Sequence, residues 1–122
     1  MRAKPTRSFK TSWFTKAAKK ARIEDAELCA ALLETQLGQA DDLGGGVFKK
    51  RLNNNMHRSL ILAKGRRHWV YAYLFAKKDR DNITPDELAD FKKLADAYAR
   101  MTPAEADAAL RNSDLLEICH DL

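Results

Sequence analysis

The sequence is poor in cysteine and lacks a long apolar run, and both shortages exclude classes of protein. Only two of its 122 residues are cysteines, Cys29 and Cys119, which stand 90 positions apart without a CxxC partner. This usage predicts reduced thiols and a cytoplasmic location, and it argues against a disulfide-stabilised secreted domain. The longest apolar run, 69–76, has eight residues, against the ~20 that cross a bilayer, so no membrane partner is expected. No apolar segment of the kind found in a secretory signal follows the basic N-terminus.

Histidine is also scarce, and the chain has no spacing typical of a metal site. His57, His68 and His120 lie in three different predicted elements, and no pair has the i,i+4 spacing of ligands on one helix face. Cys119 and His120 are adjacent, which directs their side chains to opposite faces of a strand. Cys29 lies among alanines of a predicted helix, where a buried, unreactive thiol is the usual outcome. We therefore expect no metal, no other cofactor and no cysteine nucleophile.

Charge, by contrast, is plentiful and strongly segregated along the chain. Lys and Arg number 22 against 17 Asp and Glu, which gives a net charge of +5. Residues 1–23 carry eight bases and no acid, and 47–80 carry ten bases and one acid, whereas 24–46 and 81–122 are acidic. Such separation indicates a surface for a polyanion such as nucleic acid. The alternative is that basic and acidic elements neutralise one another in the fold.

Hydrophobic periodicity and turn residues predict the order of the elements. We expect a strand at 7–11, helices from Ser12 and at 25–37, strands at 47–52, 58–63 and 68–77, helices capped at Thr84 and Thr102, and a final strand at 115–119. The first strand is expected at the edge of the sheet, and Ser12 is expected to be the N-cap of its helix.

Two features of this order define the fold class. Strand 68–77 is apolar on both faces, which is typical of a central strand. The triple glycine 44–46 precedes a strand, whereas phosphate-binding loops open a helix, so it predicts a flexible entry into the sheet. The whole pattern predicts an α+β fold built around an antiparallel sheet.

The second basic block places candidates for phosphate chemistry on three consecutive strands and their ends: Lys49, Arg51, Arg58, Lys77, Lys78 and Arg80. Antiparallel pairing would bring these groups toward one end of the sheet, so that several cations converge on one anion. Arginine offers a bidentate fork and lysine a compact charge, and such a cluster stabilises a phosphorane-like transition state. The alternative is that these groups are solvated or form ion pairs with Asp79, Asp81 and Asp86.

Two motifs resemble a known family. GGGVFKKR at 44–51 and YLFAKKDRDNITPDEL at 73–88 flank the Arg58 strand, and LLEIC follows at 115–119. In order and spacing they resemble the RelE/HigB superfamily of bacterial toxin–antitoxin ribonucleases, in particular its HigB-like branch, over roughly residues 8–101. The resemblance implies a RelE-like fold, with a small antiparallel sheet, two N-terminal helices on one face and a C-terminal helix. We expect one toxin domain over 1–122, in which 1–6 are disordered and 102–122 form a C-terminal extension.

The resemblance also implies a function. Family members are toxins that cut mRNA, many of them on the translating ribosome, and thereby inhibit translation. The 2′-hydroxyl attacks the adjacent phosphate and leaves a 2′,3′-cyclic phosphate without a metal. The predicted catalytic residues are Lys49, Arg51, Arg58, Lys77 and Arg80, and the predicted RNA-binding residues are Lys50, His57, Lys78 and Tyr73. The implied partners are mRNA, the ribosome and a cognate antitoxin, often with a helix-turn-helix domain, so that DNA is bound only through the antitoxin complex.

Some roles stay open at this point. His57 has the titration range of a general base, but the favoured interpretation is a hydrogen-bonded surface histidine. Tyr73 and Trp69 are able to stack on a base, although at least one of them is expected in the core. The basic helix of the first block faces either ribosomal RNA or the antitoxin. Two other functions fit the same features, namely a non-catalytic RNA- or antitoxin-binding module and a structural partner whose basic surface only binds an acidic antitoxin.

Overall fold

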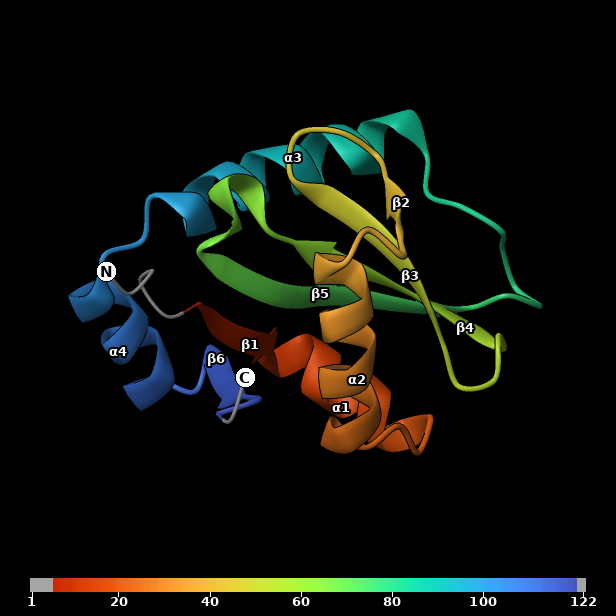
Figure 1. The fold of residues 1–122 in the computed structure, drawn as a ribbon, viewed down its shortest axis with the longest axis horizontal. Coiled ribbons are helices and arrows are strands. Elements are labelled where there is room, and N and C mark those ends of the chain that lie inside the picture. Colours follow the sequence, from red (N-terminus) through yellow and green to blue (C-terminus); the bar gives the residue numbers. More distant parts are fainter. Residues whose placement is uncertain (1–5, 121–122) are drawn as a thin grey trace.

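The computed structural model describes residues 6–120 as a six-stranded sheet with helices on both faces (Figure 1). The strands are β1 (Arg7–Thr11), β2 (Asp41–Asp42), β3 (Val47–Leu52), β4 (His57–Leu62), β5 (His68–Ala76) and β6 (Leu115–Ile118). The helices are α1 (Ser12–Lys20), α2 (Asp25–Gln36), α3 (Pro85–Ala99) and α4 (Pro103–Arg111), with a short 3-10 turn, η1 (Lys64–Arg66). The strand order is β2-β3-β4-β5-β1-β6, and only the β1–β5 pair is parallel. The predicted α+β class is therefore confirmed.

The first strand lies inside the sheet, which corrects its predicted edge position. β1 pairs with β5, where Phe9 faces Val70, and on its other side with β6, where Ser8 faces Ile118. Both pairings join residues far apart in the sequence, so the five residues of β1 contain no local signal of them. The edge next to β1 is formed by β6, and the opposite edge by β2, a pair of aspartates in the predicted loop before the glycines.

Two hydrophobic clusters, one on each face of the sheet, hold the helices in place. On one face Phe14 of α1 and Leu28 of α2 pack with Trp69 of β5. On the other face Ala95 of α3 and Ala106 of α4 pack in a cluster that includes β4 and β5 residues. β5 contributes to both clusters because its alternate side chains are apolar on both faces, which confirms its predicted central place.

Capping residues define where the helices begin. Thr84 and Thr102 each form a capping box with the glutamate three residues later, as the sequence predicts. The cap of α1 is Thr11, whose hydroxyl accepts from the Phe14 N–H at 3.0 Å, so the prediction of Ser12 is wrong by one residue. Thr11 takes this role because it ends β1 in extended backbone, the conformation of an N-cap.

The two cysteines form a disulfide, which corrects the prediction of reduced thiols and of a buried, unreactive Cys29. Cys29 on α2 and Cys119 just after β6 are bonded, with their Cα atoms 5.5 Å apart. The 90-residue separation conceals their proximity. β6 returns to pair with β1, and Ile118 and Cys119 then pack in the cluster on the face of the sheet that α2 covers. Spacing rules such as CxxC capture only local pairs.

Three predictions concern the limits of the fold. The prediction for residues 1–6 falls, apart from Thr6, on positions outside the described residues. The organisation of 1–122 as one domain with an extension at 102–122 stays a prediction. Within residues 6–120, no helix has both the length and the apolar content that a membrane span requires.

Candidate functional site

The strand register brings the predicted arginines of the basic block together at one end of the sheet. Arg51 lies opposite Arg58, and Arg58 lies opposite Phe75 on β5. Paired residues point to the same face, and so does Lys49, two residues before Arg51. The chain that follows β5 begins at this same end (Figure 1), where the Lys77 N–H donates to the carbonyl of Met56 in the β3–β4 turn at 2.9 Å.

Arg58 is a buried cation that has no acidic partner. Its exposed fraction is 8%, and its Nη1 donates to the carbonyl oxygens of Asn55 and His57 at 3.0 and 3.2 Å. Among residues 6–120 no carboxylate lies within salt-bridge distance of it, and its other N–H groups have no acceptor. These free nitrogens are not sealed from solvent. An anion that reached them would receive charge-assisted hydrogen bonds and would offset the cost of burying the charge.

The lysines of β3 are engaged elsewhere. Lys49 Nζ lies 3.8 Å from the carboxylate of Asp41 on β2. Lys50 points to the opposite face, where its Nζ donates to the carbonyl of Gln39 at 2.7 Å and lies 3.2 Å from Glu34. Both line a separate hollow of ≈ 370 Å³ beside β2, together with the exposed Arg51. The structure therefore divides the predicted basic cluster between two regions.

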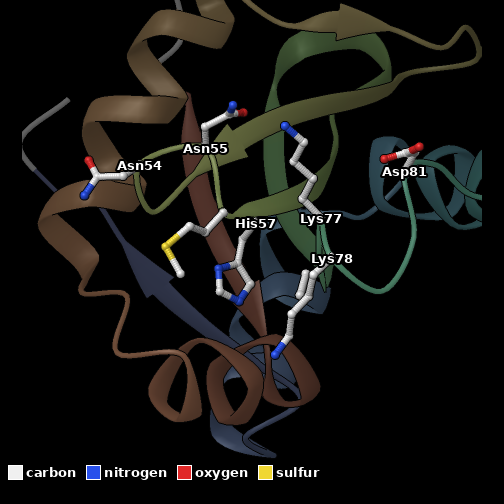
Figure 2. A pocket seen from close by; sticks show the side chains of 8 residues that line it. Asn54, Asn55, His57, Lys77, Lys78 and Asp81 are labelled. Atoms are coloured by element: carbon white, nitrogen blue, oxygen red, sulfur yellow. The ribbon is translucent and has the colours of Figure 1, made fainter.

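A hollow of ≈ 620 Å³ at the end of the sheet is lined by three of the other basic candidates, but not by Arg58 or Arg80. It lies between the β3–β4 turn and the chain after β5, and its lining includes His57, Lys77 and Lys78. Figure 2 shows the His57 ring and the Lys78 side chain pointing the same way, whereas Lys77 extends in the opposite direction and Asp81 lies apart. Exposed ammonium groups on two sides of one hollow suit an extended anion such as a sugar–phosphate chain.

The turn that forms this hollow is built on asparagine. Residues 53–55 have φ values of 56°, 52° and 70°, a left-handed backbone that asparagine tolerates, so the predicted turn chemistry is confirmed. The Asn53 amide nitrogen lies 3.2 Å from His57 Nδ1. An amide NH₂ only donates, so Nδ1 accepts and the neutral ring carries its proton on Nε2. In this arrangement His57 offers a hydrogen-bond donor, and neither ring nitrogen is free to act as a base.

Arg80 forms an ion pair with Glu87, which was not among the aspartates predicted as partners of the basic residues. Its guanidinium makes two hydrogen bonds to Glu87 in the first turn of α3 and lies over the Phe75 ring at 5.6 Å. Hydrogen bonding to Glu87 raises the pKa of Arg80 above its usual value, with a smaller contribution from the Tyr73 hydroxyl. The same ion pair lowers the pKa of Glu87 to about 2. Arg80 is thus a fixed positive charge beside Phe75 and Tyr73.

The aromatic candidates have different places. Trp69 is 2% exposed and packs in the core, whereas Tyr73 is partly buried. Tyr73 stacks on Trp13 with ring centroids 5.0 Å apart and an interplanar angle of 25°. Helical periodicity predicts one apolar stripe formed by Trp13, Phe14, Ala17, Ala18 and Ala21, yet the Trp13 side chain is half exposed. The signal in the sequence was that Trp13 is next to Phe14. Consecutive helical residues point about 100° apart around the axis, so burial of Phe14 turns Trp13 toward solvent.

Within the described chain, no three or more His, Cys, Asp or Glu side chains form a group able to hold a metal ion. The expected absence of a cofactor stays a prediction.

The comparison with known families identifies the fold. The family model described as the RelE toxin of the RelE / RelB toxin-antitoxin system matches residues 6–118. No curated protein matches the chain. Toxins of this family are generally ribonucleases, and each implies an antitoxin partner. Because the match runs from just before β1 to the last residue of β6, the protein belongs to the RelE toxin family of toxin–antitoxin systems.

Proposed function

We propose that this toxin is a metal-independent endoribonuclease of the HigB-like branch, which cleaves mRNA on the ribosome and so inhibits translation. One observation carries the proposal furthest, namely the buried guanidinium of Arg58 without a carboxylate partner in residues 6–120. Lys77, Lys78 and His57 line the hollow at the same end of the sheet, and Arg58, which does not line it, donates to the carbonyls of two of its lining residues, Asn55 and His57. These groups are all donors or cations, which suits a phosphodiester.

The chemistry that fits this site is internal transesterification. The 2′-oxygen bonds to the adjacent phosphorus and loses its proton to solvent, while the bond from phosphorus to the 5′-oxygen breaks. The products are a 2′,3′-cyclic phosphate and a 5′-hydroxyl. In this scheme the Arg58 fork stabilises the extra charge of the transition state, and the Lys78 ammonium gives a proton to the departing 5′-oxygen. His57, whose side chain leaves β4 on the opposite face from Arg58, donates from Nε2–H to an adjacent phosphate of the same RNA.

The remaining predicted groups act at the margins. Arg51 and Lys49 extend the basic face along β3, and Arg80 fixes the aromatic side of the site. Lys50 and Tyr73 bind RNA outside the reacting phosphate. Positioning of mRNA by ribosomal RNA then supplies the geometry that this small site does not impose alone.

The proposal includes the cellular setting. The toxin acts in the cytoplasm, where its antitoxin carries a helix-turn-helix domain, and DNA is bound only through that complex. Cytoplasmic thiols keep most cysteines reduced. Activity is therefore to be measured on both the disulfide form, Cys29–Cys119, and the reduced form.

The test is cleavage of a defined mRNA on purified ribosomes, followed by primer extension. Replacing Arg58 by Ala should lower the cleavage rate by about 10²- to 10³-fold, the loss typical of removing one group that stabilises transition-state charge. Arg58→Lys should retain part of the activity, because it keeps the charge without the fork. Arg111→Ala is the matched control, since Arg111 is exposed at the end of α4, away from the hollow.

Two results would contradict the proposal. A wild-type protein that leaves mRNA intact on ribosomes would support the non-catalytic binding module. An Arg58→Ala variant with native circular dichroism and undiminished cleavage would remove Arg58 from the reaction. Growth arrest on expression without antitoxin, relieved by Arg58→Ala together with Lys49→Ala, is the matching result in cells.

A further inference from the structure

The exposed stack of Trp13 on Tyr73 is a surface feature that core packing does not explain. Trp13 is 50% exposed, and the other large apolar side chains exposed in residues 6–120 are aliphatic. Indole has the largest apolar area of any side chain, so leaving half of it in water costs stability unless something covers it. Tyr73 covers one face of the indole, which leaves the opposite face to solvent.

Further aromatic contacts of Tyr73 hold the stack in place. Tyr73 also contacts Phe91 of α3, with ring centroids 5.6 Å apart, and Phe75 at 5.9 Å. The guanidinium of Arg80 in turn lies over Phe75. A row of aromatic rings that runs from the interior to the surface presents the outer ring in one orientation. Such preorganisation reduces the entropy that a flat ligand loses on stacking.

The surroundings of the stack carry charges of both signs, of which the ammonium of Lys20 is unpaired within residues 6–120, and they connect with the candidate site. Trp13 and Tyr73 line a hollow of ≈ 530 Å³ together with Lys20 and Arg80, although Asp79 also lines it. Lys20 has no ion pair within residues 6–120. His57 and Ala76 line both this hollow and the one that contains Lys77 and Lys78. One extended chain can therefore occupy both hollows past His57.

We propose that the outer face of Trp13, backed by Tyr73, is a stacking platform for one unpaired base of the RNA whose phosphates bind between His57 and Lys78. The inference rests on the proposed function and adds a base-binding position to it. Aromatic faces bind every base, and the cations beside them attract the backbone, as in other single-strand sites. The two hollows then separate two tasks, because one holds a base and the other the reacting phosphate.

The test uses a short 2′-O-methyl RNA, which cannot be cleaved, and measures its affinity through the fluorescence of Trp13. Trp69 is buried in the core and supplies a constant background. Binding should quench the emission. Trp13→Ala, followed with a fluorescent label on the RNA, should weaken binding by about 5- to 150-fold, the range for one base–aromatic stack. Trp13→Phe should keep most of the affinity, and Leu33→Ala, which removes an exposed apolar side chain on α2, should not change it.

RNA with a single abasic position gives the sharper comparison. An abasic site at the stacked position should weaken binding to the wild type but should have no further effect on Trp13→Ala, because both changes remove the same contact. Equal affinity of Trp13→Ala and wild type for the RNA would overturn the platform. So would a Trp13→Ala variant that loses antitoxin binding alone, since the surface would then belong to a protein interface.

The outcome also separates this inference from the proposed function. Arg58→Ala should lower cleavage by about the same 10²- to 10³-fold, but saturating RNA should still quench its Trp13 emission. If the wild type cleaves mRNA while Trp13→Ala binds RNA normally, the platform is wrong and the ribonuclease stands. If the wild type does not cleave, but Trp13→Ala and the abasic RNA show the shared loss, the platform stands as part of an RNA-binding module.

Discussion

Arg80 and Glu87 form the contact that ties the chain after β5 to the start of α3. The carboxylate of Glu87 receives hydrogen bonds from Arg80 and, at 2.8 Å, from the backbone N–H of Thr84. Both favour its charged form, which is why its pKa falls to about 2. Because the pKa is lower in the folded state than in the unfolded chain, the contact stabilises the fold above the ordinary glutamate pKa. That stability is lost as the pH falls through the folded value.

We expect protonation of Glu87 to lower the stability of the fold measurably at acidic pH. Between roughly pH 4.5 and pH 2, the melting temperature of the wild type should fall more steeply than that of Glu87→Gln, which has no charge to lose. In a carbon NMR titration, Arg80→Ala should raise the pKa of Glu87 toward its ordinary value. Arg100→Ala, whose partner is Asp96, is the control and should leave it unchanged. If the pKa of Glu87 in Arg80→Ala stayed at its wild-type value, the hydrogen bonds from Thr84 alone would account for the lowered pKa.

Residue types were predicted well from the sequence, but their partners were not. The alternative that acidic residues neutralise the basic ones holds for Lys49, Lys50 and Arg80. Their partners are Asp41, Glu34 and Glu87, and none is among the three aspartates named from proximity in sequence. Those pairs are set by β2–β3 pairing, by the packing of α2 and by the first turn of α3. A local pattern contains none of these relationships.

Among the elements, those with local signals were predicted and those with remote partners were not. The capping boxes of α3 and α4 and the asparagine turn before β4 depend on neighbouring residues, and all are present. The inner place of β1 depends on β5 and β6, and the disulfide depends on the packing of α2 against the face where β6 lies. At the site, the same distinction explains why the Arg58 hairpin was found and the Trp13–Tyr73 stack was missed.

The disulfide joins α2 to the end of β6, so it should contribute to stability chiefly by restricting the unfolded chain. The closure entropy of a loop of this length sets an upper value of about 4–5 kcal/mol for the loss in the free energy of unfolding on removal, and about 2–4 kcal/mol is typical of disulfides. Cys119→Ser without reductant, and the wild type with dithiothreitol, should show the same reduced denaturation midpoint. Reductant should have no effect on Cys119→Ser. Identical midpoints for wild type and variant would show that the bond does not contribute.

Over the whole molecule, the net charge of +5 combines basic side chains that form ion pairs with others that have no acidic partner. Ion pairs engage the β3 lysines and Arg80, whereas Arg51, Arg58, Lys77 and Lys78 have no carboxylate partner in residues 6–120. The charge segregation seen in the sequence therefore survives in the fold at the end of the sheet and on α1 and the turn after it, where Lys16, Lys19, Lys20 and Arg22 likewise have no ion pair within residues 6–120.

The four cations at the end of the sheet that have no carboxylate partner should give RNA binding a defined salt dependence, before any contribution from Lys20 of the stacking hollow. If each contacts one phosphate, the logarithm of affinity for single-stranded RNA should fall with the logarithm of salt concentration with a slope of about −3. Replacing Lys77 and Lys78 by Ala should reduce that slope by about 1.4, and Arg111→Ala should leave it unchanged. Fluorescence titrations at several salt concentrations measure both. A slope near zero in the wild type would leave no role for these cations in RNA binding.

The inner position of β1 has a consequence for how the toxin is made. The strand is synthesised early, yet its pairing partners are residues 68–71 on one side and 115–118 on the other. On the ribosome one edge of β1 stays unpaired until residues 68–71 have emerged, and the other edge until residues 115–118, near the end of the described chain, have emerged. The sheet that positions Arg58 is therefore complete only when Ile118 leaves the exit tunnel, which delays activity until synthesis has passed the last strand.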